Sequence, residues 1–222
     1  MSDIEEVTRS CSKCGARTRI KIYKYISIAK NPELKDKVRD GSLFLWECPH
    51  CGNVNLSIHE IMYLDPGKRL LIWLVPGDGI PETEKQASDE HLKWMNGHDY
   101  VMRFVTKIGD LVEKVLIVDA GLDDMVVEMC KYIAKLELVS KYEDKEQAAK
   151  LMDANFRFYS MDGDGENATM TIKYPIDGKL GGMTIGMNVY DDCRKIFERH
   201  PEMKPEGTFL CIDSSWIDSI MK

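Results

Sequence analysis

Two short cysteine motifs constrain this chain more than any other feature. They are Cys11-Ser-Lys-Cys14-Gly15 and Cys48-Pro-His-Cys51-Gly52, and 33 residues separate Cys14 from Cys48. A Cys-x-x-Cys pair turns both sulfurs toward one point, and two pairs complete a tetrahedron of thiolates, the shell favoured by structural Zn²⁺. The glycine after each pair suits a chain reversal, often at positive φ. The spacing therefore predicts a structural zinc site made by Cys11, Cys14, Cys48 and Cys51.

Disulfides and a redox dithiol are the alternative uses of these cysteines. The sequence begins at Met1 without a basic segment followed by an apolar run, so we expect no secretory signal and a cytoplasmic location. A reducing compartment disfavours disulfides. Two matched pairs favour shared coordination over redox chemistry. His50 lies inside the second motif and is an alternative ligand, although a side chain within such a loop is expected to point outward.

Composition limits the remaining classes of protein. The 222 residues are 44% hydrophobic and 30% charged, which is typical of a globular chain with room for one large or two small domains. No apolar run approaches the roughly 20 residues that span a bilayer, so we expect no membrane partner. The net charge of -7 argues against general binding of polyanions.

A basic strand follows the first motif. Residues 17–28 alternate between isoleucine and polar side chains, the period of a half-buried strand, and no acid occurs from residue 7 to residue 30. Cations here could meet phosphates while tyrosines stack on bases, which predicts a nucleic-acid site. A solvated face that balances the charge of the thiolates is the other interpretation. The residues concerned are Arg17, Arg19, Lys21, Tyr23 and Tyr25.

The pattern of residues predicts an α+β protein. Residues 1–75 are expected to form a zinc-ribbon-like antiparallel sheet with an inserted helix, and residues 76–98 an acidic linker. Residues 99–222 are expected to form a helical hairpin followed by a C-terminal strand-rich α+β unit. In the first part, Asn31 and Pro32 begin a helix that Gly41 ends. The strands expected there are 17–28, 42–47, 53–63 and 69–75, with a tight turn at 65–68.

The second half carries weaker signals. Thr106 begins one helix, Gly121 ends it, and Asp123 caps the next. The strands expected in this half are 100–105, 156–160, 168–174, 182–188 and 208–212, with a helix at 191–200. Met161, Met170 and Met203 fit no helical register, which indicates either core filling or an adaptable surface for a partner.

The chain resembles the CpXC family, bacterial and archaeal proteins named for their paired knuckles. Besides the two cysteine motifs, the resemblance rests on segments 40–44, 62–66, 70–73 and 111–124, and it covers most of residues 10–135. Ser12 stands where the family name expects proline, but that residue is no ligand. The resemblance implies the four metal ligands and carries no biochemical activity with it.

Enzymatic chemistry has little support in the sequence. His59, His91, His98 and His200 are dispersed, and no pair of nucleophile and base is recognisable. The segment from Asp162 begins like a calcium loop but has Lys173 where a glutamate ligand is required, so it is interpreted as a hairpin turn. We therefore predict a non-enzymatic zinc-binding protein that acts as a protein-interaction adaptor. A nucleic-acid-binding module is the alternative, and an enzyme with an unrecognised site is less favoured.

Overall fold

The computed structural model describes residues 3–77, 94–95 and 97–221. The chain divides into two compact units, which are described separately. Unit 1 comprises residues 1–115 and 207–211, and unit 2 comprises residues 116–206 and 212–222. Most of the predicted linker, residues 76–98, lies outside the described residues, and the domain boundaries predicted from composition stay a prediction. Within the described residues, no helix is both long enough and apolar enough to cross a membrane.

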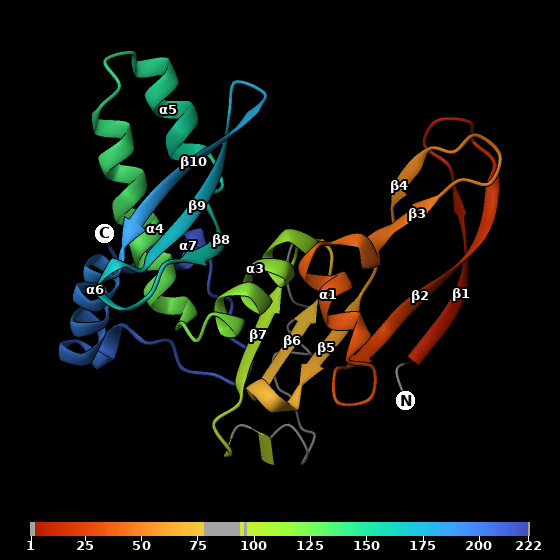
Figure 1. The fold of residues 1–222 in the computed structure, drawn as a ribbon, viewed down its shortest axis with the longest axis horizontal. Coiled ribbons are helices and arrows are strands. Elements are labelled where there is room, and N and C mark those ends of the chain that lie inside the picture. The colour runs from red at the N-terminus through yellow and green to blue at the C-terminus, as the bar shows by residue number, and fades with distance from the viewer. Residues whose placement is uncertain (1–2, 78–93, 96, 222) are drawn as a thin grey trace. The chain divides into compact units, whose positions relative to one another are not determined.

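Unit 1 is built on a five-stranded sheet with the order β1-β2-β5-β6-β7 (Figure 1). The pairs β1·β2 and β5·β6 are antiparallel, whereas β2·β5 and β6·β7 are parallel. The sheet was predicted to be antiparallel, but it is mixed. A long connection separates the two strands of each parallel pair, as parallel pairing requires. The strands are β1 (Asp3–Ser10), β2 (Arg17–Ser27), β5 (Ile61–Asp65), β6 (Leu70–Leu74) and β7 (Val101–Val105).

The crossover from β2 to β5 contains the predicted inserted helix and a small second sheet. Helix α1 (Glu33–Arg39) ends before Gly41, which has a φ of 77° as a helix-ending glycine should. Strands β3 (Leu45–Glu47) and β4 (Val54–Leu56) form an antiparallel hairpin around the second cysteine motif. Strand β3 is shorter than predicted because residues 42–44 form a 3-10 turn. The predicted strand 53–63 is divided into β4 and the beginning of β5.

The C-terminal part of unit 1 adds one short pairing to β7. Residues 208–212 were predicted as a strand, but only Leu210 pairs, through a single parallel bridge to Arg103. Helix α3 (Ile108–Asp119) follows β7 and ends before Gly121, whose φ is 73°. The boundary between the two units falls within α3, after Val115.

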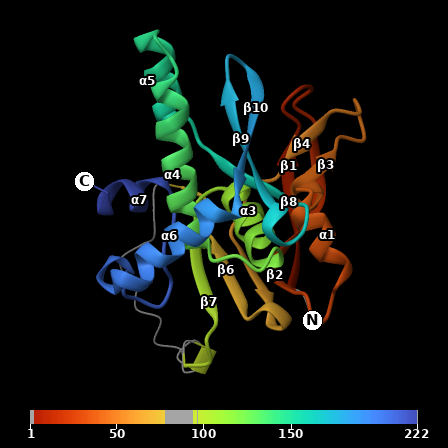
Figure 2. The same cartoon turned by 60° about the vertical axis from the view of Figure 1, so that its left-hand side comes forward.

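Unit 2 packs four helices against a three-stranded sheet. Helix α4 (Asp124–Ser140) is capped by Asp123, whose carboxylate accepts a hydrogen bond from the Met125 backbone N–H, as predicted. Helix α5 (Lys145–Asp153), which the sequence did not predict, lies beside α4 in both views (Figures 1 and 2). The other elements are α6 (Met187–Arg199), α7 (Ser214–Ile220), and the sheet β10-β9-β8, formed by β8 (Arg157–Asp162), β9 (Thr169–Ile176) and β10 (Lys179–Gly186).

The methionines without a helical register belong to the core of unit 2. Met170 is fully buried there, and Met161 and Met203 pack against the same cluster. All three therefore contribute to the core of unit 2, in line with the first of the two interpretations. The order of elements, with an N-terminal sheet, then helices, then a strand-rich unit, confirms the predicted α+β class.

Candidate metal centre

The two cysteine motifs adopt the same backbone turn. In the first, the Gly15 N–H donates to the Cys11 carbonyl at 3.0 Å, and in the second the Gly52 N–H donates to the Cys48 carbonyl at 2.9 Å. Both glycines have positive φ, 71° and 68°, a conformation that other residues rarely adopt. The sequence predicted this requirement. The two turns are therefore geometrically equivalent and each presents its two sulfurs on one side.

The four sulfurs converge on one point. The ligand atoms of Cys11, Cys14, Cys48 and Cys51 all lie within 4.8 Å of one another. Two contacts join different motifs: Cys11 Sγ lies 3.7 Å from Cys51 Sγ, and Cys14 Sγ lies 3.7 Å from Cys48 Sγ. A disulfide bond is about 2.05 Å long, so these are separate thiols. Each motif alone supplies two donors, and together they form a set that could hold a metal ion.

Burial of the cluster is graded. Cys11 and Cys48 are buried, Cys51 is half-buried and Cys14 is exposed. An ion bound here would thus sit at the edge of unit 1, anchored by two buried sulfurs. The other cysteines, at positions 130, 193 and 211, do not belong to the cluster. Cys130 and Cys193 are core residues of unit 2, as predicted, whereas Cys211 is exposed.

The surroundings of the sulfurs shift the pKa values of Cys11 and Cys51 in opposite directions. The pKa of the Cys11 thiol is lowered to about 6, chiefly because the Cys14 backbone N–H hydrogen-bonds its sulfur, with smaller help from Lys13 and Asn55 and against the effect of burial. At Cys51, the Asn53 backbone N–H lowers the pKa, but burial and the hydrogen bonds with the other three cysteines outweigh it and raise that pKa to about 12. Hydrogen bonds in the first turn therefore favour ionisation of the Cys11 thiol, whereas burial and the neighbouring sulfurs disfavour ionisation of Cys51.

Asn55 ties the two motifs together, and sequence reasoning missed it. This buried side chain comes from β4, yet its Nδ2 lies 3.7 Å from the Cys11 sulfur and its Oδ1 accepts hydrogen bonds from the Ser12 N–H and hydroxyl, both at 2.9 Å. Its Nδ2 also donates to the Asn53 carbonyl at 2.9 Å. The signal in the sequence was Asn55, three positions after Gly52, on the polar side of an alternation whose other side is Val54, Leu56 and Ile58.

His50 and the basic strand lie outside the sulfur cluster. The His50 side chain is exposed, in agreement with the expectation that it points outward. Arg17, Arg19 and Lys21 share one exposed face of β2, where Lys21 stands opposite Glu6 of β1. The predicted aromatic partners are less accessible: Tyr23 and Tyr25 are half-buried. Tyr25 packs against a buried cluster formed by Leu64, Leu71, Met95 and Met102.

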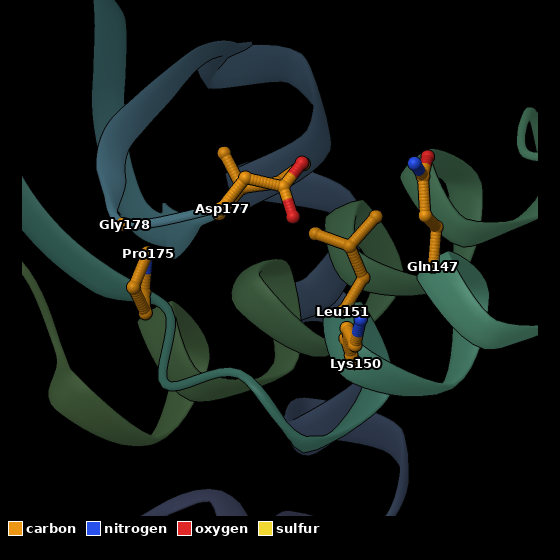
Figure 3. Close-up of a pocket in the computed structure, with 7 residues that line it drawn as sticks. Gln147, Lys150, Leu151, Pro175, Asp177 and Gly178 are labelled. Atoms are coloured by element: carbon orange, nitrogen blue, oxygen red, sulfur yellow. The ribbon is translucent and has the colours of Figure 1, made fainter.

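A shallow cavity in unit 2 is separate from all of these residues. It has a volume of about 130 Å³ and lies between α5 and the turn that joins β9 to β10 (Figure 3). Lys150, which already pairs with Glu146 at 2.8 Å, and the exposed Asp177 line it beside Leu151. None of the predicted site residues reaches it. The cavity therefore shares no residue with the sulfur cluster.

Comparison with known protein families matches the part of the chain that contains the four cysteines. A sequence model of the CpXC protein family matches residues 10–131, a stretch that contains both cysteine motifs and Asn55. Neither the curated proteins nor the solved structures gave a match to the chain.

Proposed function

The chain belongs to the CpXC family, and we propose that it is a non-enzymatic zinc-binding protein: a protein-interaction adaptor whose N-terminal unit is held together by a structural Cys₄ zinc site. We place this function in the cytoplasm, where thiolates stay reduced and available to a metal.

The distance between sulfurs of different motifs carries the zinc proposal. Zn–S bonds are about 2.3 Å long, so the edge of a regular ZnS₄ tetrahedron is about 3.8 Å. Two Sγ–Sγ contacts measure 3.7 Å, and each joins a residue of the first motif to one of the second. Four thiolates also match the softness of zinc better than that of magnesium or calcium, which prefer oxygen ligands.

A full thiolate shell supports a structural role for the ion. Catalytic zinc keeps one position for water or substrate, whereas structural zinc is closed by four protein ligands. The four cysteines supply all four positions, and the exposed His50 offers no replacement from within the cluster. The ion would join two turns that lie far apart in sequence, and it would thereby fix the β1–β2 and β3–β4 hairpins against each other.

Metal analysis of the purified full chain tests the zinc proposal. We expect one zinc per chain and a tetrahedral sulfur shell by X-ray absorption. A chelator should remove the zinc and lower the unfolding temperature, and adding zinc back should restore it. Iron in place of zinc, or a shell containing water oxygen, would contradict the proposed structural zinc.

The adaptor role needs its own test. We expect a protein partner to stay bound to the zinc-loaded chain at high salt, because apolar contacts are not screened by ions. The same partner should dissociate from the Cys48→Ser variant if the zinc-dependent unit presents the binding surface. A partner that binds both forms equally would show that the zinc-dependent unit does not serve as the adaptor.

A nucleic-acid-binding module is a second candidate, favoured by one observation. Arg17, Arg19 and Lys21 lie in a row on one exposed strand face directly after the first cysteine motif. Binding of single-stranded RNA or DNA should weaken steeply with salt and be lost when the three cations are changed to glutamate. Changing Lys141, Lys145 and Lys150 of unit 2 to glutamate is the matched control for net charge. Equal loss in both triple variants would exclude the strand as the site.

A further inference from the structure

An exposed apolar face lies on the small hairpin that carries the second cysteine motif. Four aliphatic side chains define it, here called the knuckle face: Leu45, Val54, Leu56 and Ile58, which are 49%, 59%, 53% and 56% exposed. Leu45 stands directly opposite Leu56 in the register of β3 and β4, and both lie on the same side of the hairpin. The exposed Glu47, opposite Val54, is the one charged residue of the two strands on that side. Ile58 continues the alternation two positions beyond Leu56. Such clustering on a small hairpin is unlike the scattered surface apolar residues of ordinary proteins.

The other side of the hairpin packs against the rest of unit 1, so the knuckle face points toward solvent. Phe44, Asn55 and Ser57 are buried, and Asn55 bonds the first cysteine motif. A shift of one residue in strand register would exchange the two faces and expose these anchors. Asn55 and its bonds to the first cysteine motif thus hold the knuckle face toward solvent, and a metal ion shared by the two motifs would strengthen this arrangement.

The hairpin also has open strand edges. Hydrogen bonds from Cys48 to Asn53 and from Ser57 to Phe44 set the phase of the antiparallel ladder. In that phase, the intervening pairs Leu45–Leu56 and Glu47–Val54 direct their backbone N–H and C=O groups away from the partner strand. No third strand joins β3 and β4 within the described ranges. The Leu45 N–H bonds the Ser42 carbonyl, and the Val54 carbonyl accepts from the Asn53 side chain. The Leu45 carbonyl, the Val54 N–H and both backbone groups of Glu47 and Leu56 face the two edges.

The size of the knuckle face decides between possible occupants. Complete burial of an aliphatic side chain removes roughly 100 Å² of apolar surface, so four half-exposed side chains offer on the order of 200 Å². A stable interface between two proteins buries about 800 Å² on each partner. If a second copy of the chain docked through this face alone, the buried area would be far smaller than a stable dimer needs. A short extended segment needs much less area, because backbone hydrogen bonds to a strand edge add to its apolar contacts.

We infer that the knuckle face is the docking surface for a short extended segment of a partner protein, with large apolar side chains at alternate positions. This inference rests on the proposed adaptor function and names the chemistry of its partner. The segment would add to an edge of the β3–β4 hairpin, and its alternate side chains would cover Leu45, Val54, Leu56 and Ile58. Binding would depend on zinc, since the ion holds the hairpin in place.

A displayed library of random short peptides, selected on the zinc-loaded full chain, tests this inference. We expect enriched peptides to share large apolar residues at every second position. Their Kd should rise roughly tenfold or more in the Val54→Lys/Leu56→Lys double variant, and it should change little with salt. Ile4→Lys and Leu180→Lys are matched controls, since both residues are exposed aliphatic side chains outside the knuckle face. Neither control should weaken binding.

Three results would overturn the inference: no enriched peptide, an affinity that the double variant leaves unchanged, or a dimer in sedimentation that the double variant dissolves. Zinc content is measured for every protein. If the double variant loses its zinc, the milder Leu45→Ser/Ile58→Ser variant replaces it in the same assay. A wild-type chain without zinc would defeat the proposed function itself, whereas zinc-loaded variants that bind the peptides normally would defeat only this inference.

Discussion

Asn55 reaches from β4 to the sulfur of Cys11, with 3.7 Å between Nδ2 and Sγ. This contact crosses between the two cysteine motifs, which are far apart in the sequence. The same side chain accepts two hydrogen bonds from Ser12, so it fixes both the charge and the position of the first turn. Groups of this kind, which hold a metal ligand without touching the metal, tune affinity as strongly as geometry does.

Replacing Asn55 with alanine should therefore weaken zinc binding. The loss of a donor to the Cys11 thiolate and of the Ser12 anchor should lower affinity by about 10–100-fold, measured by competition with a chromophoric chelator. Asn53→Ala is the matched control, because Asn53 bonds Ser12 and Asn55 but no sulfur through its side chain. The role assigned to Asn55 is wrong if both variants lose affinity equally.

Cys48→Ser should release the metal and destabilise unit 1. The variant lacks one buried thiolate, and the binding free energy of a structural zinc, about 10–16 kcal/mol in small zinc domains, contributes directly to folding. Metal content and thermal unfolding measure the two effects. His50→Ala, two residues away on an exposed position, should keep one zinc and an unchanged unfolding temperature. Loss of zinc from His50→Ala would instead make the histidine a ligand.

His59 should make unit 1 less stable in mild acid. Burial is the main cause that lowers the pKa of its ring below the ordinary value, assisted by the charges of Arg9 and Lys24. The neutral ring is thus favoured in the folded state, and its contribution to stability is complete above about pH 6.5 and is lost as the pH falls through the lowered pKa.

The pH effect of His59 is measured as the free energy of unfolding between about pH 7 and pH 5. The dependence should be steeper in the wild type than in His59→Gln, with both proteins loaded with zinc, and the difference between them isolates this ring from the cysteines. Titration of the His59 ring by NMR at or above its ordinary pKa would contradict the expectation.

Two adjacent glycines in β10 should respond differently to alanine. A Cβ at Gly181 would lie 2.7 Å from the ring of Tyr174, which is stacked on Phe156 with centroids 4.6 Å apart and has little room to move. A Cβ at Gly182 would meet its nearest atom at 3.8 Å. Gly181→Ala should therefore cost about 1–3 kcal/mol in urea unfolding, and Gly182→Ala should stay within about 0.5 kcal/mol. Similar costs would mean that Tyr174 rotates freely.

Local signals in the sequence were sufficient for the sulfur turns and several helix ends. Gly15, Gly52 and Gly121 were expected where the backbone needs positive φ, and each has it. Asp123 was expected to cap a helix and does so. These features depend on the backbone conformation and hydrogen bonds of a few neighbouring residues, so a short stretch of sequence is enough to predict them.

Features that depend on distant parts of the chain were missed. Helix α5 buries only Leu151 among its nine residues, so it has no apolar stripe to reveal it, and Glu146 and Lys150 support it by an ion pair instead. The alternation of Val54, Leu56 and Ile58 indicates a strand but not which face is buried. That choice is made by Asn55, whose partners lie more than 40 residues away in the first motif.

The short distance between Cys14 and Cys48 would make a metal ion bound there a removable staple. It closes a loop that contains β2, α1 and β3, and by the chain-entropy relation for cross-links a loop of this length restricts the unfolded chain by about 4 kcal/mol. Unlike a disulfide, such a staple would open when the supply of the metal falls, and it would need no reductant. The abundance of the folded N-terminal unit should consequently follow the free zinc of its surroundings.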